Sequence, residues 1–114
     1  MNILIILNDP PYGTERSYNG LRMAKALSNN KTHVTVFLMA DAIVCAKRGQ
    51  NVPQGFYNLE LMLNSVLRKG DVLLCGTCMD ARGFKDTDVI DGAQRSTMKE
   101  LAERTLAADK VLVF

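Results

Sequence analysis

Two cysteines three residues apart, Cys75 and Cys78, are the side chains in this sequence best suited to covalent chemistry. Gly76 follows the first of them and lets the backbone turn sharply, and Arg82 brings a positive charge close by in the chain. The thiolate is the reactive form of cysteine, and nearby cations or unpaired backbone N–H groups stabilise it. Cys75, at the end of an apolar run, is therefore a candidate nucleophile. The competing interpretation is a small buried apolar residue that ends a core strand.

The CxxC spacing is compatible with three kinds of site. A thioredoxin-like oxidoreductase opens an early helix with this motif, whereas we expect a loop after Cys78. A zinc site needs about four ligands, and only Cys45 and His33 remain as further Cys or His ligands, so we expect no metal. The third is a cysteine that accepts sulfur as a persulfide, with the second thiol as its neighbour or resolving group.

The elements that would position these thiols follow from the apolar pattern. Four short runs of mostly branched residues predict strands covered on both faces, at residues 3–7, 34–39, 72–75 and 111–114. Helical spacing of apolar residues predicts helices over residues 15–28, 57–68 and 94–107, with a shorter one over 41–48. Alternation of this kind predicts a doubly wound α/β sheet with right-handed crossovers.

In such a fold the functional crevice lies outside the carboxyl ends of the strands. Three loops leave those ends, at residues 8–14, 40–41 and 76–91. They bring Tyr12, Glu15, Asp41 and Thr77 to the crevice, where Tyr12 and Glu15 would form a wall beside Cys75. The competing interpretation of these loops is turn formation and helix capping, and the expected caps are Thr14 or Ser17, Asp41 and Asp91.

The composition excludes several classes of protein. The chain has 114 residues, which predicts one domain over 1–114, and its 14 Lys and Arg against 12 Asp and Glu are too balanced for a typical nucleic-acid binder. No Walker or GxGxxG motif indicates a nucleotide cofactor. No apolar stretch resembles a signal peptide or a membrane span, and three cysteines are too few for a secreted disulfide framework, so we expect a cytoplasmic protein without a membrane partner.

Several motifs in order resemble those of the DsrE/DsrF-like family, and of its YchN-like branch in particular. They occupy residues 11–15, 21–24, 37–42, 48–50, 75–83 and 108–112, and the likeness runs from residue 2 to residue 114. The resemblance implies a three-layer α/β/α fold with a central, mostly parallel sheet of four to five strands. It also implies homo-oligomers, commonly trimers or hexamers, and a role in intracellular sulfur metabolism. In the family's sulfur-relay members, a cysteine at the position that Cys75 resembles accepts a persulfide sulfur and passes it on.

The sequence therefore leads to two functional hypotheses. In the first, Cys75 carries sulfane sulfur between a protein donor and acceptor, as a sulfurtransferase-like carrier without a metal or organic cofactor. Arg82 and turn N–H groups would stabilise its thiolate, and Cys78, assigned from spacing alone, would release the sulfur by forming a disulfide. In the second, the protein is an oligomeric ligand-binding or regulatory module whose cysteines pack or sense oxidation. Oligomerisation is also predicted by apolar residues outside the helical stripes, namely Met23, Phe56, Phe84 and Val89.

Overall fold

The computed structural model describes residues 1–114 and is built on a five-stranded sheet. All four neighbouring pairs of strands are parallel, and the strand order is β4-β3-β2-β1-β5. The strands are β1 (Asn2–Leu7), β2 (His33–Leu38), β3 (Asp71–Cys75), β4 (Gln94–Ser96) and β5 (Lys110–Val113). The parallel α/β sheet predicted from the alternation is confirmed.

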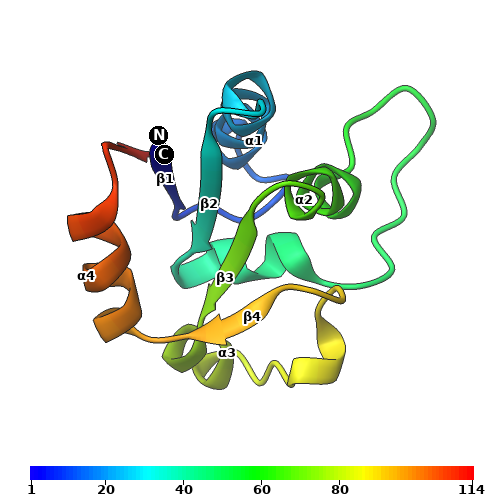
Figure 1. The fold of residues 1–114 in the computed structure, drawn as a ribbon. Helices are drawn as coiled ribbons and strands as arrows, with labels where there is room; N and C mark the ends of the chain where they lie inside the picture. Colours follow the sequence, from blue (N-terminus) through cyan, green and yellow to red (C-terminus); the bar gives the residue numbers. More distant parts are fainter.

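Helices cover both faces of the sheet, which gives the three-layer arrangement (Figure 1). The helices are α1 (Arg16–Leu27), α2 (Leu59–Leu67), α3 (Gly76–Ala81) and α4 (Met98–Ala107), with 3₁₀ turns η1 (Ala40–Ala46) and η2 (Asp86–Asp88). The chain moves along the sheet from β1 to β4 and then crosses back to β5 through α4. Because right-handed crossovers in opposite directions place their helices on opposite faces, α4 lies opposite α1 and α2.

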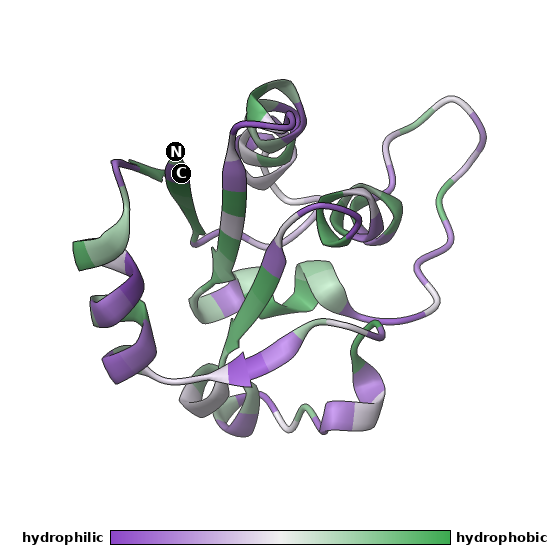
Figure 2. Ribbon diagram, in the orientation of Figure 1, coloured by the Kyte–Doolittle hydropathy of each residue, from purple (hydrophilic) through white to green (hydrophobic).

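The core forms between these layers because the central strands bury both of their faces. Strands β1, β2 and β3 are buried along almost their whole length, and their Ile, Leu, Val and Phe side chains belong to one cluster of 25 buried apolar residues. Figure 2 shows the contrast between these apolar central strands and the hydrophilic β4 at the edge of the sheet. None of the helices combines the length and apolar character needed to cross a bilayer.

Side-chain caps define where two of the helices begin. The Asn58 side chain accepts the backbone N–H of Leu61 at 3.1 Å and starts α2. The Thr97 hydroxyl accepts the N–H of Glu100 at 3.1 Å and starts α4. Both caps satisfy backbone donors that lack partners inside the helix.

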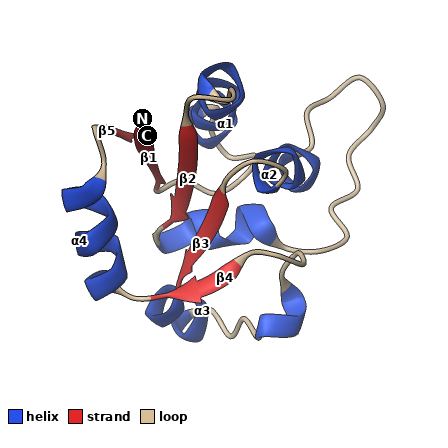
Figure 3. Cartoon of the chain, in the orientation of Figure 1, coloured by secondary structure: helices blue, strands red, loops and turns tan.

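The largest correction to the sequence-based elements concerns the helix predicted over residues 94–107. Residues Gln94–Ser96 instead form β4, which pairs with β3, and the helix begins only at Met98. The segment after Cys78, expected to be a loop, continues as helix α3 to Ala81. Figure 3 shows that β3 runs into α3 and β4 leads into α4 at the same end of the sheet.

The predicted caps also differ from those observed. Helix α1 has no side-chain cap: the Ser17 hydroxyl donates to the Asp9 carbonyl oxygen at 2.6 Å instead. Asp41 lies inside η1, a 3₁₀ helix where an α-helix over 41–48 was expected, and Asp91 pairs with Arg48. For Ser17 the reason is that a short polar side chain can bond several nearby backbone groups, and its local sequence does not choose among them.

Two of the four apolar residues expected at a subunit boundary belong to this chain's own interior. Val89 is buried in the core, and Phe84 packs against it. Met23 and Phe56 are exposed, as expected for residues outside the helical stripes.

Candidate functional site

Cys75 is at once the last residue of β3 and the residue that caps α3. Its Sγ accepts the backbone N–H of Cys78 at 3.3 Å and lies 3.3 Å from the Thr77 hydroxyl oxygen. A branched apolar run ends here, and the helix that follows directs one of its free N–H groups, that of Cys78, at the sulfur. Donors aimed at a sulfur favour its thiolate over its thiol form.

The sharp passage from β3 into α3 depends on Gly76. A Cβ at this position would lie 3.0 Å from the Ser96 carbonyl oxygen and 3.1 Å from Cγ of Arg95, so β4 lies directly against the glycine. The Arg95 guanidinium also donates to the Gly76 carbonyl oxygen at 3.0 Å. The absence of a side chain at Gly76 therefore lets β4 hold the turn that carries Cys75.

Cys75 and Cys78 are joined by a disulfide, with their Cα atoms 5.2 Å apart. The Cys78 sulfur accepts the backbone N–H of Ala40 at 3.2 Å and lies 3.8 Å from the Met39 sulfur. Ala40 is the one non-glycine residue with positive φ, at 54°. This uncommon conformation directs its N–H at the site, which is where such backbone strain tends to be found. Each sulfur of the pair is thus met by a backbone donor.

An open pocket of about 410 Å³ lies beside Cys75 on the α4 side of the carboxyl ends of β2, β3 and β4. Cys75 is 7% exposed and belongs to the cluster of 25 buried apolar residues, and it also forms part of the wall of this pocket. The lining residues are Phe37, Met39, Cys75, Gly76, Thr77, Asp80, Arg95, Ser96, Thr97 and Met98. The pocket combines apolar walls with hydroxyl groups next to the sulfur.

Charged side chains form ion pairs around this site and make no hydrogen bond to its sulfurs. Arg95 pairs with Asp86 and Asp80, each at 3.0 Å, and the hydrogen bonds to these carboxylates raise the pKa of Arg95. Arg82 pairs with Asp41 at 2.8 Å and donates to the Cys78 carbonyl oxygen at 3.1 Å. The guanidinium of Arg82 thus holds the backbone of α3, and its hydrogen bonds go to oxygen atoms.

The structure brings only part of the predicted set together. Cys75 and Thr77 line the pocket and Cys78 is bonded to Cys75, whereas Tyr12, Glu15 and Asp41 do not line it. The Tyr12 hydroxyl donates to the Gln50 side chain and accepts the backbone N–H of Leu59 at 3.3 Å. Glu15 occupies the position before α1.

Sequence reasoning missed the contribution of β4 and the start of α4. Arg95, Ser96 and Met98 all line the pocket, and Ser96 pairs with Cys75 across the β3–β4 ladder. The buried Ser96 hydroxyl donates to the Glu100 carboxylate. One local signal could have found this boundary, because Thr97 followed three residues later by Glu100 is a typical helix-start pattern.

Comparisons with known proteins show which family this chain belongs to. The model of the DsrE/DsrF-like family matches residues 1–114. The chain belongs to the DsrE/DsrF-like family. It is 43% identical over 115 residues to the protein YchN of Escherichia coli K12, covering 98% of this chain and 97% of that protein. This DsrE/DsrF-like chain is also 35% identical to protein MJ0989 of Methanocaldococcus jannaschii over the full length of both.

A solved structure shares the fold of this DsrE/DsrF-like chain. The crystal structure of YchN from E. coli superposes with a TM-score of 0.93 at 42% identity, over 99% of this chain and 98% of that one. The family and the YchN-like branch expected from the motifs are therefore confirmed, together with the parallel sheet flanked by helices.

Proposed function

We propose that this protein acts in sulfur metabolism by accepting sulfane sulfur as a persulfide on Cys75 and relaying it to an acceptor. The observation that carries the proposal is the environment of the Cys75 sulfur, which lines an open pocket and is met by the Cys78 N–H and the Thr77 hydroxyl. These groups are the ones that a thiolate nucleophile requires, and membership in the DsrE/DsrF-like family supports the choice of sulfur as cargo.

The accepting step is an exchange at sulfur. The Cys75 thiolate attacks the terminal sulfur of a donor persulfide, R–S–SH, and forms a new S–S bond. The bond between the donor's inner sulfur and the terminal sulfur breaks, and R–S⁻ leaves with the electron pair. The proton stays on the transferred sulfur. Because electrons move only between sulfur atoms, the step needs neither a metal nor an organic cofactor.

Two routes release the sulfur. An acceptor thiolate can attack the outer sulfur of the Cys75 persulfide, so that Cys75 leaves as a thiolate and the protein is regenerated. Alternatively, the Cys78 thiolate attacks the Cys75 sulfur, forms the Cys75–Cys78 disulfide and expels HS⁻. The second route matches the disulfide in the structure, and a dithiol reductant must then return the pair to thiols.

The arginines belong to the framework of this proposal rather than to its chemistry. Arg82 bonds the Cys78 carbonyl oxygen and Arg95 bonds the Gly76 carbonyl oxygen, so the two fix the ends of the turn between the sulfurs. We therefore propose Arg82 as a positioning residue, in place of the thiolate-stabilising role expected from its proximity in sequence. The remaining expectations, a cytoplasmic homo-oligomer with protein sulfur donors and acceptors, form part of the same proposal.

A regulatory module is the second candidate, because the disulfide lies beside a pocket that could bind a ligand. In that case oxidation of Cys75 and Cys78 would alter the pocket, and no sulfur would be transferred. Graded-pH alkylation of the reduced protein separates the two. A Cys75 that stays unreactive in the folded protein favours the regulatory module.

Mass spectrometry of the intact protein tests sulfur loading directly. Reduced protein is treated with glutathione persulfide, and we expect a gain of one sulfur atom in the wild type, a longer-lived gain in Cys78→Ser and none at the site in Cys75→Ser. Cys45→Ser is the matched control, because that thiol is buried away from the pocket, and it should load like the wild type. Equal loading of wild type and Cys75→Ser would remove Cys75 from the mechanism.

A further inference from the structure

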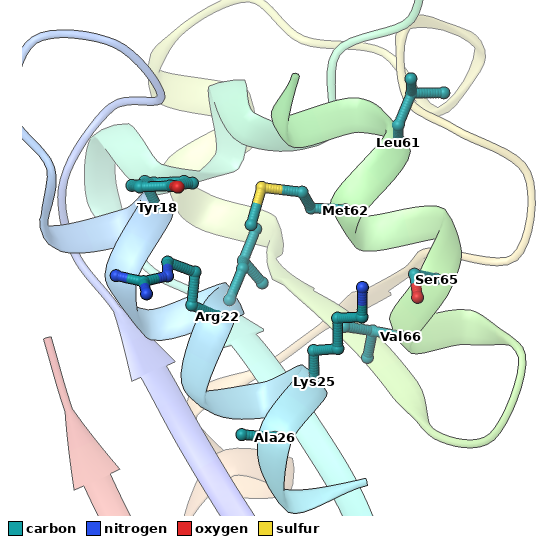
Figure 4. A pocket seen from close by; sticks show the side chains of 9 residues that line it. Tyr18, Arg22, Lys25, Ala26, Leu61, Met62, Ser65 and Val66 are labelled. Atoms are coloured by element: carbon teal, nitrogen blue, oxygen red, sulfur yellow. The ribbon is translucent and has the colours of Figure 1, made fainter. Parts of the chain in front are cut away.

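A second concave surface lies between α1 and α2, on the face of the sheet opposite α4. It encloses about 510 Å³, which is within the range of small-molecule sites. The lining residues are Tyr18, Leu21, Arg22, Lys25, Ala26, Leu61, Met62, Ser65 and Val66. We call this surface the α1–α2 groove (Figure 4). None of its residues belongs to the Cys75 pocket.

The floor of the α1–α2 groove is apolar and fixed. Leu21 and Val66 are buried beneath it, and the Met62 thioether reaches from α2 toward α1 across its centre (Figure 4). The small side chains of Ala26 and Ser65 leave the space above the floor open. An apolar ligand here would exchange water for contacts with carbon and sulfur atoms.

One aromatic residue that lines the groove belongs to a stack of three tyrosines. Tyr18, in the first turn of α1, stacks on Tyr57, which precedes α2, with ring centroids 4.0 Å apart. Tyr12 also stacks on Tyr57, with ring centroids 5.9 Å apart. The volume of about 510 Å³ suits a small ligand.

Both charged residues that line the groove are cations. Lys25 takes part in no ion pair, and its amine points into the space between the helices (Figure 4). Arg22 also has no carboxylate partner, but its guanidinium points away from the space between the helices (Figure 4), where it bonds the Asn19 side-chain oxygen and lies over the Tyr18 ring at 5.6 Å. No acidic side chain lines the groove. A ligand that complements its charge would therefore be an anion.

We infer that the α1–α2 groove binds a small amphipathic monocarboxylate, with its apolar chain or ring on Met62 and its carboxylate at Lys25. The walls are helix surfaces whose backbone N–H groups are already bonded within the helices. The anion must therefore be held by side chains alone. One unpaired cation above an apolar floor suits one carboxylate, whereas a nucleotide's phosphate chain carries several negative charges.

Calorimetric titration with octanoate tests this inference, with octanamide and octylamine as probes of the same chain length. We expect octanoate to bind and to shift the NMR signals of α1 and α2, octanamide to bind more weakly, and octylamine not to bind. Lys25→Gln should weaken octanoate binding roughly tenfold, as expected for the loss of one charge-assisted contact. Lys99→Gln, at an exposed lysine on α4, is the matched control and should bind like the wild type.

Three results would overturn the inference. The first is equal binding of octanoate and octylamine. The second is a set of octanoate-induced NMR shifts confined to residues outside α1 and α2. The third is no octanoate binding because a second copy of the chain already covers the groove. The Cys75→Ser variant keeps the groove intact, so octanoate binding in that variant is independent of whether sulfur is relayed.

Discussion

At the scale of single residues, the environment separates cysteines that are chemically identical. Cys45 is fully buried, with its sulfur 3.7 Å from the Asp9 carbonyl oxygen, and burial raises the pKa of its thiol to about 12. Cys75 instead lines a pocket and accepts a backbone N–H from Cys78. Neither difference can be read from the residue type, because both depend on what the fold brings within a few ångströms of each sulfur.

The raised pKa of Cys45 predicts a loss of stability in alkali. The unfolded thiol ionises near its ordinary value of 9.0, whereas the folded one keeps its proton to about 12. The folded state therefore binds more protons between these values, so the contribution of Cys45 is complete below pH 9 and declines as the pH rises above it. In the disulfide form Cys45 is the only free thiol. Urea unfolding on both sides of pH 9 should show a shallower decline for Cys45→Ala than for the wild type, and identical slopes would contradict this.

At the scale of elements, the turn from α2 into β3 depends on close backbone contact. The Gly70 N–H bonds the Val66 carbonyl oxygen at 2.8 Å as α2 ends, and a Cβ at Gly70 would collide with the Val34 carbonyl oxygen in β2. The obstacle is backbone of a central strand, so it cannot move aside as the end of a flexible side chain could. This contact sets the start of β3 and hence the register that places Cys75 at the pocket.

Gly70→Ala should therefore lower the free energy of unfolding by at least about 2 kcal/mol. Gly13→Ala is the matched control, because a Cβ there would make an ordinary 3.6 Å contact with Pro10. We expect that variant to stay within about 0.5 kcal/mol of the wild type. Urea denaturation followed by circular dichroism measures both, and similar stability of the two variants would show that β2 does yield to the extra atom.

At the scale of the whole molecule, the outer surface carries large apolar side chains that are exposed. Met98 and Leu106 are exposed on α4, and Val113 is exposed on the edge strand β5. An edge strand also presents unpaired backbone groups on its outer side. Apolar side chains grouped in this way commonly mark contact surfaces between subunits. They are better candidates for such a surface than Phe84 and Val89, which pack within the chain.

We expect the purified protein to form trimers or hexamers, as proposed above. Light scattering coupled to size exclusion measures the mass, and Leu106→Glu should shift it toward the monomer, because a buried charge at an interface is costly. Glu103→Gln, also exposed on α4, should leave the mass unchanged. A wild-type monomer at micromolar concentration would contradict oligomerisation, and an unchanged mass in Leu106→Glu would place the contact elsewhere.

The sequence by itself determined the elements that have strong local patterns and the place of Cys75 in the fold. Continuous apolar runs predicted β1, β2, β3 and β5, helical spacing predicted α1 and α2, and the parallel topology placed Cys75 at the carboxyl edge of the sheet. Each of these follows from side-chain periodicity within a dozen residues.

Only the tertiary structure decided what surrounds that thiol. Strand β4 has no apolar pattern and exists because Gln94–Ser96 bond to β3, which in turn brings Arg95 and Ser96 to the pocket. The N–H of Ala40 bonds the sulfur of Cys78, which is 38 positions away in the chain. The Tyr12 hydroxyl bonds the N–H of Leu59 at the start of α2 and lies outside the pocket. Contacts between distant segments depend on how the layers pack together, and local periodicity carries no information about that packing.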